Sequence, residues 1–176
     1  MRWLTVVLLC ACGASVDSEN PAVNDGPEPM VDAAVDAPID ARPCSGGDQS
    51  MVAPDGSCFV FFGQTTTYAA AKLACESIDA HLAVLTTAAL DTAAEAFVGT
   101  NDTWIGLDDL ATEATFVWVD GTPLAFANFH AGEPNDSGGE DCAVIAGLRT
   151  GKQWDDRPCV PNANGLGGDY ARLCQF

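Results

Sequence analysis

Two short segments of the chain concentrate side-chain oxygen atoms that could bind a metal ion. The first runs Glu133-Pro134-Asn135-Asp136-Ser137-Gly138-Gly139-Glu140-Asp141-Cys142, and the second is Trp154-Asp155-Asp156, which precedes Cys159. Carboxylate and amide oxygens suit Ca²⁺, which takes roughly six to eight oxygen ligands in a flexible geometry. Zinc and copper favour nitrogen and sulfur donors, which these segments do not offer once the cysteines are paired. If a disulfide between Cys142 and Cys159 draws the segments together, their oxygens face one point, and the sequence predicts a calcium site there.

The first segment ends a long loop, residues 123–141, in which regular patterning fades. A loop of this length inside a compact domain is usually functional or disordered. Because it carries the acidic motif, we interpret it as functional. His130 lies in this loop three positions before Glu133 and could touch a ligand, although a surface histidine is the simpler interpretation.

The rest of the pattern predicts the elements that must position these segments. Helices are expected over residues 65–77 and 88–97, the second capped by Thr86 or Thr87. The cysteines at 44 and 58 enclose a turn-rich hairpin. Two early helices followed by short strands predict an α+β domain. The strands are expected at residues 58–62, 104–107, 116–119, 142–145 and 170–174, and a buried strand or extended segment is expected at residues 80–85.

The overall charge excludes several classes of partner. The chain has 176 residues and a formal net charge of −18, from 7 Lys and Arg against 25 Asp and Glu. This acidic balance argues against nucleic acid and against attachment to anionic lipid through basic residues. Excess carboxylate suits a cation-binding protein, although an acidic surface that serves only solubility has the same composition.

Residues 1–11 are predicted to form an export signal, because Arg2 precedes an apolar run that is too short to span a bilayer. Leu9-Cys10-Ala11-Cys12-Gly13 is similar to the lipobox of bacterial lipoproteins, which implies lipidation of Cys12 and a membrane contact through that lipid. We therefore expect an exported protein, lipid-anchored on a bacterial outer membrane or cell surface. An ordinary signal peptide, and hence a secreted protein, is the alternative.

Residues 12–43 are expected to be a disordered tether, because acids recur there among Ala, Val and Pro and no aromatic residue occurs. The folded domain then covers residues 44–176. An even number of cysteines in an exported chain implies a disulfide framework. Spacing alone leaves open the pairing of the domain's six cysteines, which are Cys44, Cys58, Cys75, Cys142, Cys159 and Cys174.

Over residues 44–176 the chain resembles a C-type lectin domain. The resemblance implies the pairings Cys75–Cys174 and Cys142–Cys159, with Cys44–Cys58 as the additional bridge of longer family members. It rests on the order and spacing of several motifs together, which are a helix containing Cys75, Ala80-His81-Leu82-Ala83, Trp104-Ile105-Gly106-Leu107, Glu133-Pro134-Asn135, Gly139-Glu140-Asp141-Cys142, Trp154-Asp155-Asp156 and Cys174.

The resemblance implies Ca²⁺ as the cofactor and glycans as partners. The Glu-Pro-Asn order in this family goes with sugars that carry vicinal equatorial hydroxyls, such as mannose, glucose, N-acetylglucosamine or fucose, rather than galactose. A cis peptide bond before Pro134 would turn both neighbouring side chains to the metal. The implied ligands are Glu133, Asn135, Glu140, Asp155 and Asp156 for the principal calcium, and Asp109, Glu113, Asp136 and Asp141 for a second one, with Glu140 bridging both. The implied sugar-binding residues are Glu133, Asn135, Glu140 and Asp155.

The chain departs from the family at Asp155, where the family usually has asparagine. Asparagine both ligates calcium and donates a hydrogen bond to the sugar, whereas an ionised aspartate cannot donate. A hydroxyl left unpaired costs about 1–3 kcal/mol if it is buried. This departure keeps open a second function, a calcium-binding module for a protein ligand.

An enzyme is the third class of function. A glycosidase that uses paired carboxylates would need one acid held neutral in an apolar pocket. Asp155 and Asp156 lie among other acids and an expected metal ion, so both should stay ionised and we do not expect turnover.

Overall fold

The computed structural model describes residues 43–162 and 168–176. The described residues belong to one compact unit, Ala41–Phe176. The predicted signal at 1–11, the predicted lipidation of Cys12 and all but the last residue of the predicted tether lie outside the described residues. In the described part of the chain, every helix is too short or too polar to cross a membrane.

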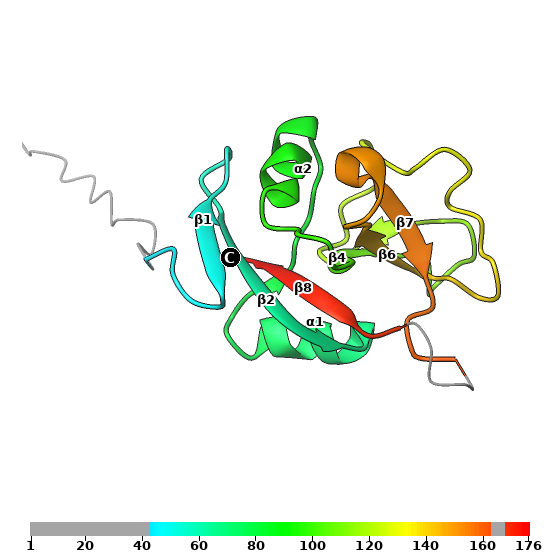
Figure 1. The fold of residues 1–176 in the computed structure, drawn as a ribbon, viewed down its shortest axis with the longest axis horizontal. Helices are drawn as coiled ribbons and strands as arrows, with labels where there is room; N and C mark the ends of the chain where they lie inside the picture. The colour runs from blue at the N-terminus through cyan, green and yellow to red at the C-terminus, as the bar shows by residue number, and fades with distance from the viewer. Residues whose placement is uncertain (1–42, 163–167) are drawn as a thin grey trace, which may run out of the picture. The chain divides into compact units, whose positions relative to one another are not determined.

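A mixed sheet of eight strands forms the centre of the domain (Figure 1). Its main path runs β1 (Gln49–Val52), β2 (Cys58–Thr66), β8 (Tyr170–Gln175), β4 (Thr103–Asp108), β6 (Cys142–Ile145) and β7 (Trp154–Arg157). The short strands β3 (His81–Leu82) and β5 (Val117–Trp118) pair with β8 and β4. All pairs are antiparallel except β4 with β8. The sheet thus brings the two ends of the chain's folded part together at β2 and β8.

Both α-helices follow a capping threonine. Helix α1 (Tyr68–Glu76) starts after Thr67, whose side chain accepts a hydrogen bond of 3.4 Å from the backbone N–H of Ala70. Helix α2 (Ala88–Glu95) starts after Thr87, which accepts one of 3.3 Å from the N–H of Leu90. These bonds satisfy backbone donors that have no partner inside a helix.

The two helices cover opposite faces of the sheet (Figure 1). Side chains alternate between faces along a strand, so neighbouring residues of β8 enter different cores. Leu173 packs in one buried cluster with Leu90 and Ala94 of α2, whereas Cys174 packs in the other with Tyr68 and Ala71 of α1. Burial of both faces explains why the strands read as nearly continuous apolar runs.

Three disulfides join Cys44 to Cys58, Cys75 to Cys174 and Cys142 to Cys159. These are the pairings that the resemblance implies, and the α+β fold with two helices is confirmed. The first bridge joins the segment before β1 to the start of β2, the second joins α1 to β8, and the third joins the start of β6 to the residues after β7.

Several predicted boundaries are wrong in detail. Helix α1 begins at Tyr68 rather than at residue 65, because strand β2 continues to Thr66. Leu73 of this helix is 66% exposed. Of the strand or extended segment expected at residues 80–85, only β3 pairs as a strand, and the N–H of Val84 donates a hydrogen bond of 2.8 Å to the side chain of Gln175. Helix α2 ends at Glu95 rather than at residue 97, β5 spans only Val117–Trp118, and β7 was not predicted.

Candidate calcium and sugar site

Strand β7 places the two aspartates of the second motif in the sheet. Asp155 pairs with Val144 and Asp156 with Ala143 in the antiparallel β6–β7 ladder. Both aspartate side chains are fully buried. Buried carboxylates are retained only where hydrogen bonds, counter-ions or metals compensate the loss of water. Their surroundings therefore define the chemistry of the site.

An aromatic cluster fixes the long loop against β7. The ring of Trp154 meets those of Trp118, Phe126 and Phe129 edge-on, with centroids 5.6, 5.7 and 5.6 Å away. Backbone bonds reinforce the contact, because Trp154 N donates to Asn128 O at 2.7 Å and His130 N donates to Trp154 O at 2.8 Å. Trp154 thus holds the long loop next to Asp155 and Asp156, which follow it on β7.

The carboxylate of Asp156 holds the acidic motif itself. It accepts hydrogen bonds from the backbone N–H of Asn135 at 2.9 Å and from that of Asp136 at 2.7 Å. The peptide bond between Glu133 and Pro134 is cis, which confirms the expectation from the sequence. The two motifs, about twenty residues apart in sequence, therefore lie in direct contact.

Three carboxylates converge where the motifs meet. Oxygen atoms of Glu133, Asp155 and Asp156 all lie within 4.8 Å of one another. Ca²⁺ binds oxygens at about 2.3–2.6 Å, so two ligands of one ion are at most about 5 Å apart. The Oδ1 atom of Asp155 is buried and has no hydrogen-bond partner in the described residues, which is costly without a cation. The donor set and this unpartnered oxygen fit Ca²⁺.

Two arginines balance the charge of Asp155. Its Oδ2 atom lies 2.6 Å from Nη2 of Arg149 and 2.7 Å from Nη1 of Arg157. Arg149 also reaches Oε1 of Glu133 at 3.1 Å. Asp155 is therefore paired through one oxygen, while the other oxygen remains for a metal ion.

The other predicted ligands lie around this centre. The amide of Asn135 donates to Oε2 of Glu133. Glu140 is outside the group of three convergent carboxylates, and its Oε2 accepts from the N–H of Ser137 at 3.1 Å. Burial, and next the charge of Asp156, raise the pKa of Glu140. Glu140 therefore lies close enough to interact electrostatically with the centre.

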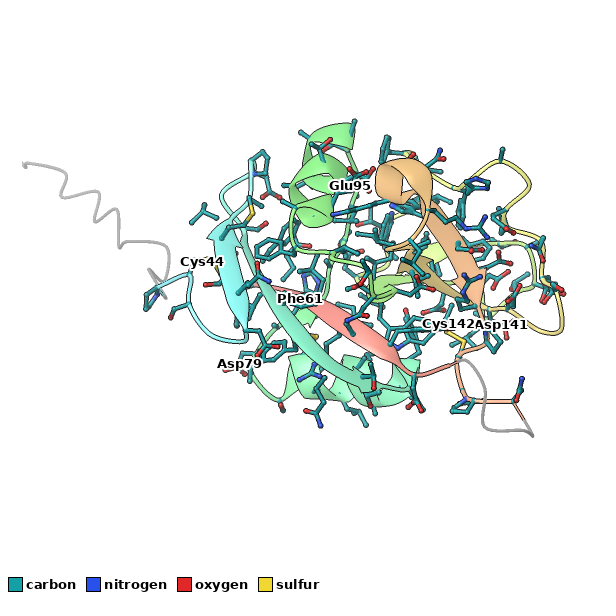
Figure 2. All side chains as sticks on the ribbon, in the orientation of Figure 1. Cys44, Phe61, Asp79, Glu95, Asp141 and Cys142 are labelled. Carbon is teal, nitrogen blue, oxygen red and sulfur yellow. A yellow bond between two sulfur atoms is a disulfide. The ribbon has the colours of Figure 1, made fainter. Side chains whose placement is uncertain are left out.

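A second set of acids lines an adjoining pocket of about 200 Å³. Asp109, Glu113 and Asp136 line it, together with Asn135 and Asp156 of the principal site. Asp109 is buried, its Oδ1 has no hydrogen-bond partner among the described residues, and burial raises its pKa. Asp141 contributes a backbone oxygen to the N–H of Asp109 at 3.1 Å, and Figure 2 shows it beside Cys142 at the start of β6. The predicted residues of the second site are thus neighbours, with Asp141 outside the pocket lining.

A model of the lectin C-type domain matches residues 64–164. The chain belongs to the C-type lectin domain family. Among proteins, it is 34% identical over 103 residues to the mouse low affinity immunoglobulin epsilon Fc receptor, covering 58% of this chain and 30% of that protein. It is 35% identical over 130 residues to human C-type lectin domain family 4 member G, and this match covers 69% of this chain and 42% of that protein. The chain thus spans less than half the length of these curated relatives.

Solved structures of C-type lectin domains show the same fold. The cow carbohydrate-recognition domain of CD23, determined in the presence of a GlcNAc2Man3 oligosaccharide, superposes with a TM-score of 0.63 at 26% identity, covering 75% of this chain and 95% of that one. The carbohydrate-recognition domain of the human scavenger receptor C-type lectin superposes with a TM-score of 0.62 at 27% identity, covering 75% of this chain and 98% of that one. The C-type lectin-like fold predicted from the motifs is therefore confirmed.

Sequence reasoning missed the two arginines at the site. Arg157 could have been found, because it lies two positions after Asp155 on a strand and so shares its face. Arg149 has no such signal. It lies in the turn before the short 3-10 helix Thr150–Lys152, and only the fold shows which side of β7 this turn reaches.

Proposed function

We propose that this chain is a calcium-dependent lectin whose bound Ca²⁺ accepts two adjacent equatorial hydroxyls of a mannose-type sugar. The observation that carries the proposal is the convergence of Glu133, Asp155 and Asp156 within 4.8 Å, next to the Asn135 side chain. The principal calcium would be held by these residues with Glu140. A second calcium would be held by Asp109, Glu113, Asp136 and Asp141.

The protein groups around the ion would select the ligand. Calcium supplies coordination positions that sugar hydroxyl oxygens can fill. The Glu133 carboxylate can accept a hydrogen bond from one hydroxyl, and the Asn135 amide can donate one, both from the rim of the site. The CD23 domain studied with a mannose-containing oligosaccharide supports this substrate class. With only two hydroxyls in contact, we expect a single-site affinity in roughly the millimolar range.

A matched pair of affinity columns tests the proposal. Protein should be retained on mannose-agarose with calcium, pass through with chelator, and pass through galactose-agarose in both buffers. Glu133→Gln should lose retention, because it weakens both the metal and the hydroxyl contact. Asp120→Asn is the control, since Asp120 is exposed and bonds only within its own turn among the described residues. Passage through the mannose column with calcium present would reject the lectin proposal.

A calcium-binding module for a protein ligand is the second candidate. The ionised Asp155 cannot donate to a hydroxyl, and one relative is by name a receptor for an immunoglobulin. This candidate predicts calcium uptake without any response to monosaccharides. Calorimetry with calcium, followed by titration of methyl mannoside, separates the two functions.

We also propose that Cys12 carries a lipid that tethers the domain to a bacterial surface. The support is the sequence Leu9-Cys10-Ala11-Cys12-Gly13 alone. Labelling with radioactive palmitate in a bacterial host should mark the wild-type chain and not Cys12→Ser. Equal labelling of both would refute the anchor.

A further inference from the structure

We propose that Arg149 donates a hydrogen bond to the bound sugar, on the side of the site where the ionised Asp155 cannot donate. This inference rests on the proposed lectin function. It adds a ligand contact from a residue that lies outside both acidic motifs.

The need for a donor follows from the chemistry of a hydroxyl. Its oxygen can coordinate a cation while its hydrogen points to a carboxylate, and the remaining lone pair then takes an N–H donor. On one side of the site, the amide of Asn135 contacts the carboxylate of Glu133 and can provide this N–H donor. On the other side, Asp155 offers only acceptor oxygens, and the N–H groups nearest to it come from arginine.

Arg149 spans the two sides. Its Nε and Nη2 lie 2.9 and 2.6 Å from Oδ2 of Asp155, and Nη2 also lies 3.1 Å from Oε1 of Glu133. The Arg149 side chain is 32% exposed, whereas that of Asp155 is 0% exposed. A ligand approaching Asp155 therefore meets the guanidinium at the surface of the site.

The guanidinium keeps a donor for a ligand. The contacts to Asp155 and Glu133 use Nε and Nη2. Within the described residues, Nη1 has one contact, at 3.2 Å from Nδ1 of His130. Because Nη1 carries two hydrogens, at least one N–H remains for a hydroxyl oxygen.

The turn that carries Arg149 is held in place. The N–H of Gly147 donates to Oδ1 of Asp102 at 3.1 Å. A Cβ atom at Gly147 would lie 2.6 Å from the backbone oxygen of Asn101, so the turn packs tightly on its neighbour. Arg157, by contrast, bonds to Asp102 at 3.4 Å and to the backbone oxygen of Asp156 at 3.3 Å besides Asp155. Arg149 is therefore the arginine that joins both sides of the site.

Three variants of the full chain test this role. Arg149→Met keeps the length of the side chain and removes its donors. Arg149→Met combined with Asp155→Asn returns an amide donor at position 155. Lys72→Gln, which removes a cation on helix α1, is the charge control. For each variant, calorimetry gives the calcium affinity. The concentration of methyl mannoside that inhibits retention on mannose-agarose at saturating calcium gives the sugar affinity.

We expect Arg149→Met to weaken sugar binding about tenfold or more, the cost of a lost charge-assisted bond, while calcium binding changes less than about threefold. The double variant should regain sugar affinity to within about threefold of wild type. Unchanged sugar binding in Arg149→Met would overturn the inference. Equal losses of calcium and sugar affinity would also overturn it, because Arg149 would then only position Glu133 and Asp155. Failure of the wild-type chain to bind sugar would instead reject the lectin proposal itself.

Discussion

The indole N–H of Trp154 donates a hydrogen bond of 2.7 Å to Oδ1 of Asp91, and this contact ties helix α2 to the strand that carries the candidate ligands. Asn128 donates to Oδ2 of the same carboxylate at 2.7 Å. Asp91 is thus shared by a helix, a strand and the long loop. Burial raises the pKa of Asp91, and these two hydrogen bonds lower it in part.

Asp91→Ala should destabilise the domain by about 1–3 kcal/mol, because the buried N–H of Trp154 loses its acceptor. Denaturant unfolding followed by tryptophan fluorescence measures this loss. Glu76→Ala, at an exposed position of helix α1, is the control and should change stability little. Equal effects of the two variants would show that the Asp91 contact contributes nothing.

Calcium should stabilise the fold. A ligand that binds only the native state adds about 2.7 kcal/mol at a concentration 100-fold above its Kd. We therefore expect the thermal midpoint to rise in calcium and fall in chelator, as measured by differential scanning calorimetry. Glu133→Gln should lose most of this shift, and Asp120→Asn should keep it. Identical midpoints in calcium and chelator would argue against the site.

The disulfides should differ in their contribution to stability. Cys75 and Cys174 are 99 residues apart, whereas Cys142 and Cys159 are 17 apart. In the chain-entropy model, these bridges contribute about 4–5 and about 3 kcal/mol. Paired Cys→Ala variants compared by urea unfolding test the order. Loss of the shorter bridge should in addition weaken calcium binding, because it separates the ends of β6 and β7; calorimetry that finds wild-type calcium affinity there would contradict this.

Both tyrosines of the chain should resist ionisation in the native state. Burial, then the charge of Asp108 and the 2.8 Å hydrogen bond to it, raise the pKa of Tyr68 far above its ordinary value. Burial also raises the pKa of Tyr170. A raised pKa stabilises the fold below about pH 10, and this stability is lost as the pH rises beyond the unfolded value.

An alkaline titration followed by tyrosinate absorbance measures this directly. We expect the tyrosinate signal of the folded protein to appear at higher pH than that of the denatured protein, and its final part to rise together with unfolding followed by circular dichroism. Denatured protein is the reference and should titrate near pH 10. A native titration with that ordinary midpoint would show that the tyrosines are not protected.

Local patterns predicted much of the fold. Thr87 precedes an apolar periodic run and does cap α2, and the continuous apolar run at Cys142–Ile145 does form a strand buried on both faces. At Val84 the pattern left open a strand or an extended segment, and the structure shows that a side chain 91 positions away takes the place of a strand partner. The residues next to Val84 in the sequence do not predict a contact over this distance along the chain.

The sequence by itself determined which atoms are available at the site. The oxygen donors of Glu133, Asn135 and Asp156, and the Asp155 that replaces asparagine, are visible in the chain without a fold. Only the tertiary structure decided how Asp155 is neutralised, because Arg149 reaches its carboxylate from a turn that local patterns do not orient. The strength of an ion pair depends on distance and burial, and both are properties of packing rather than of residue order.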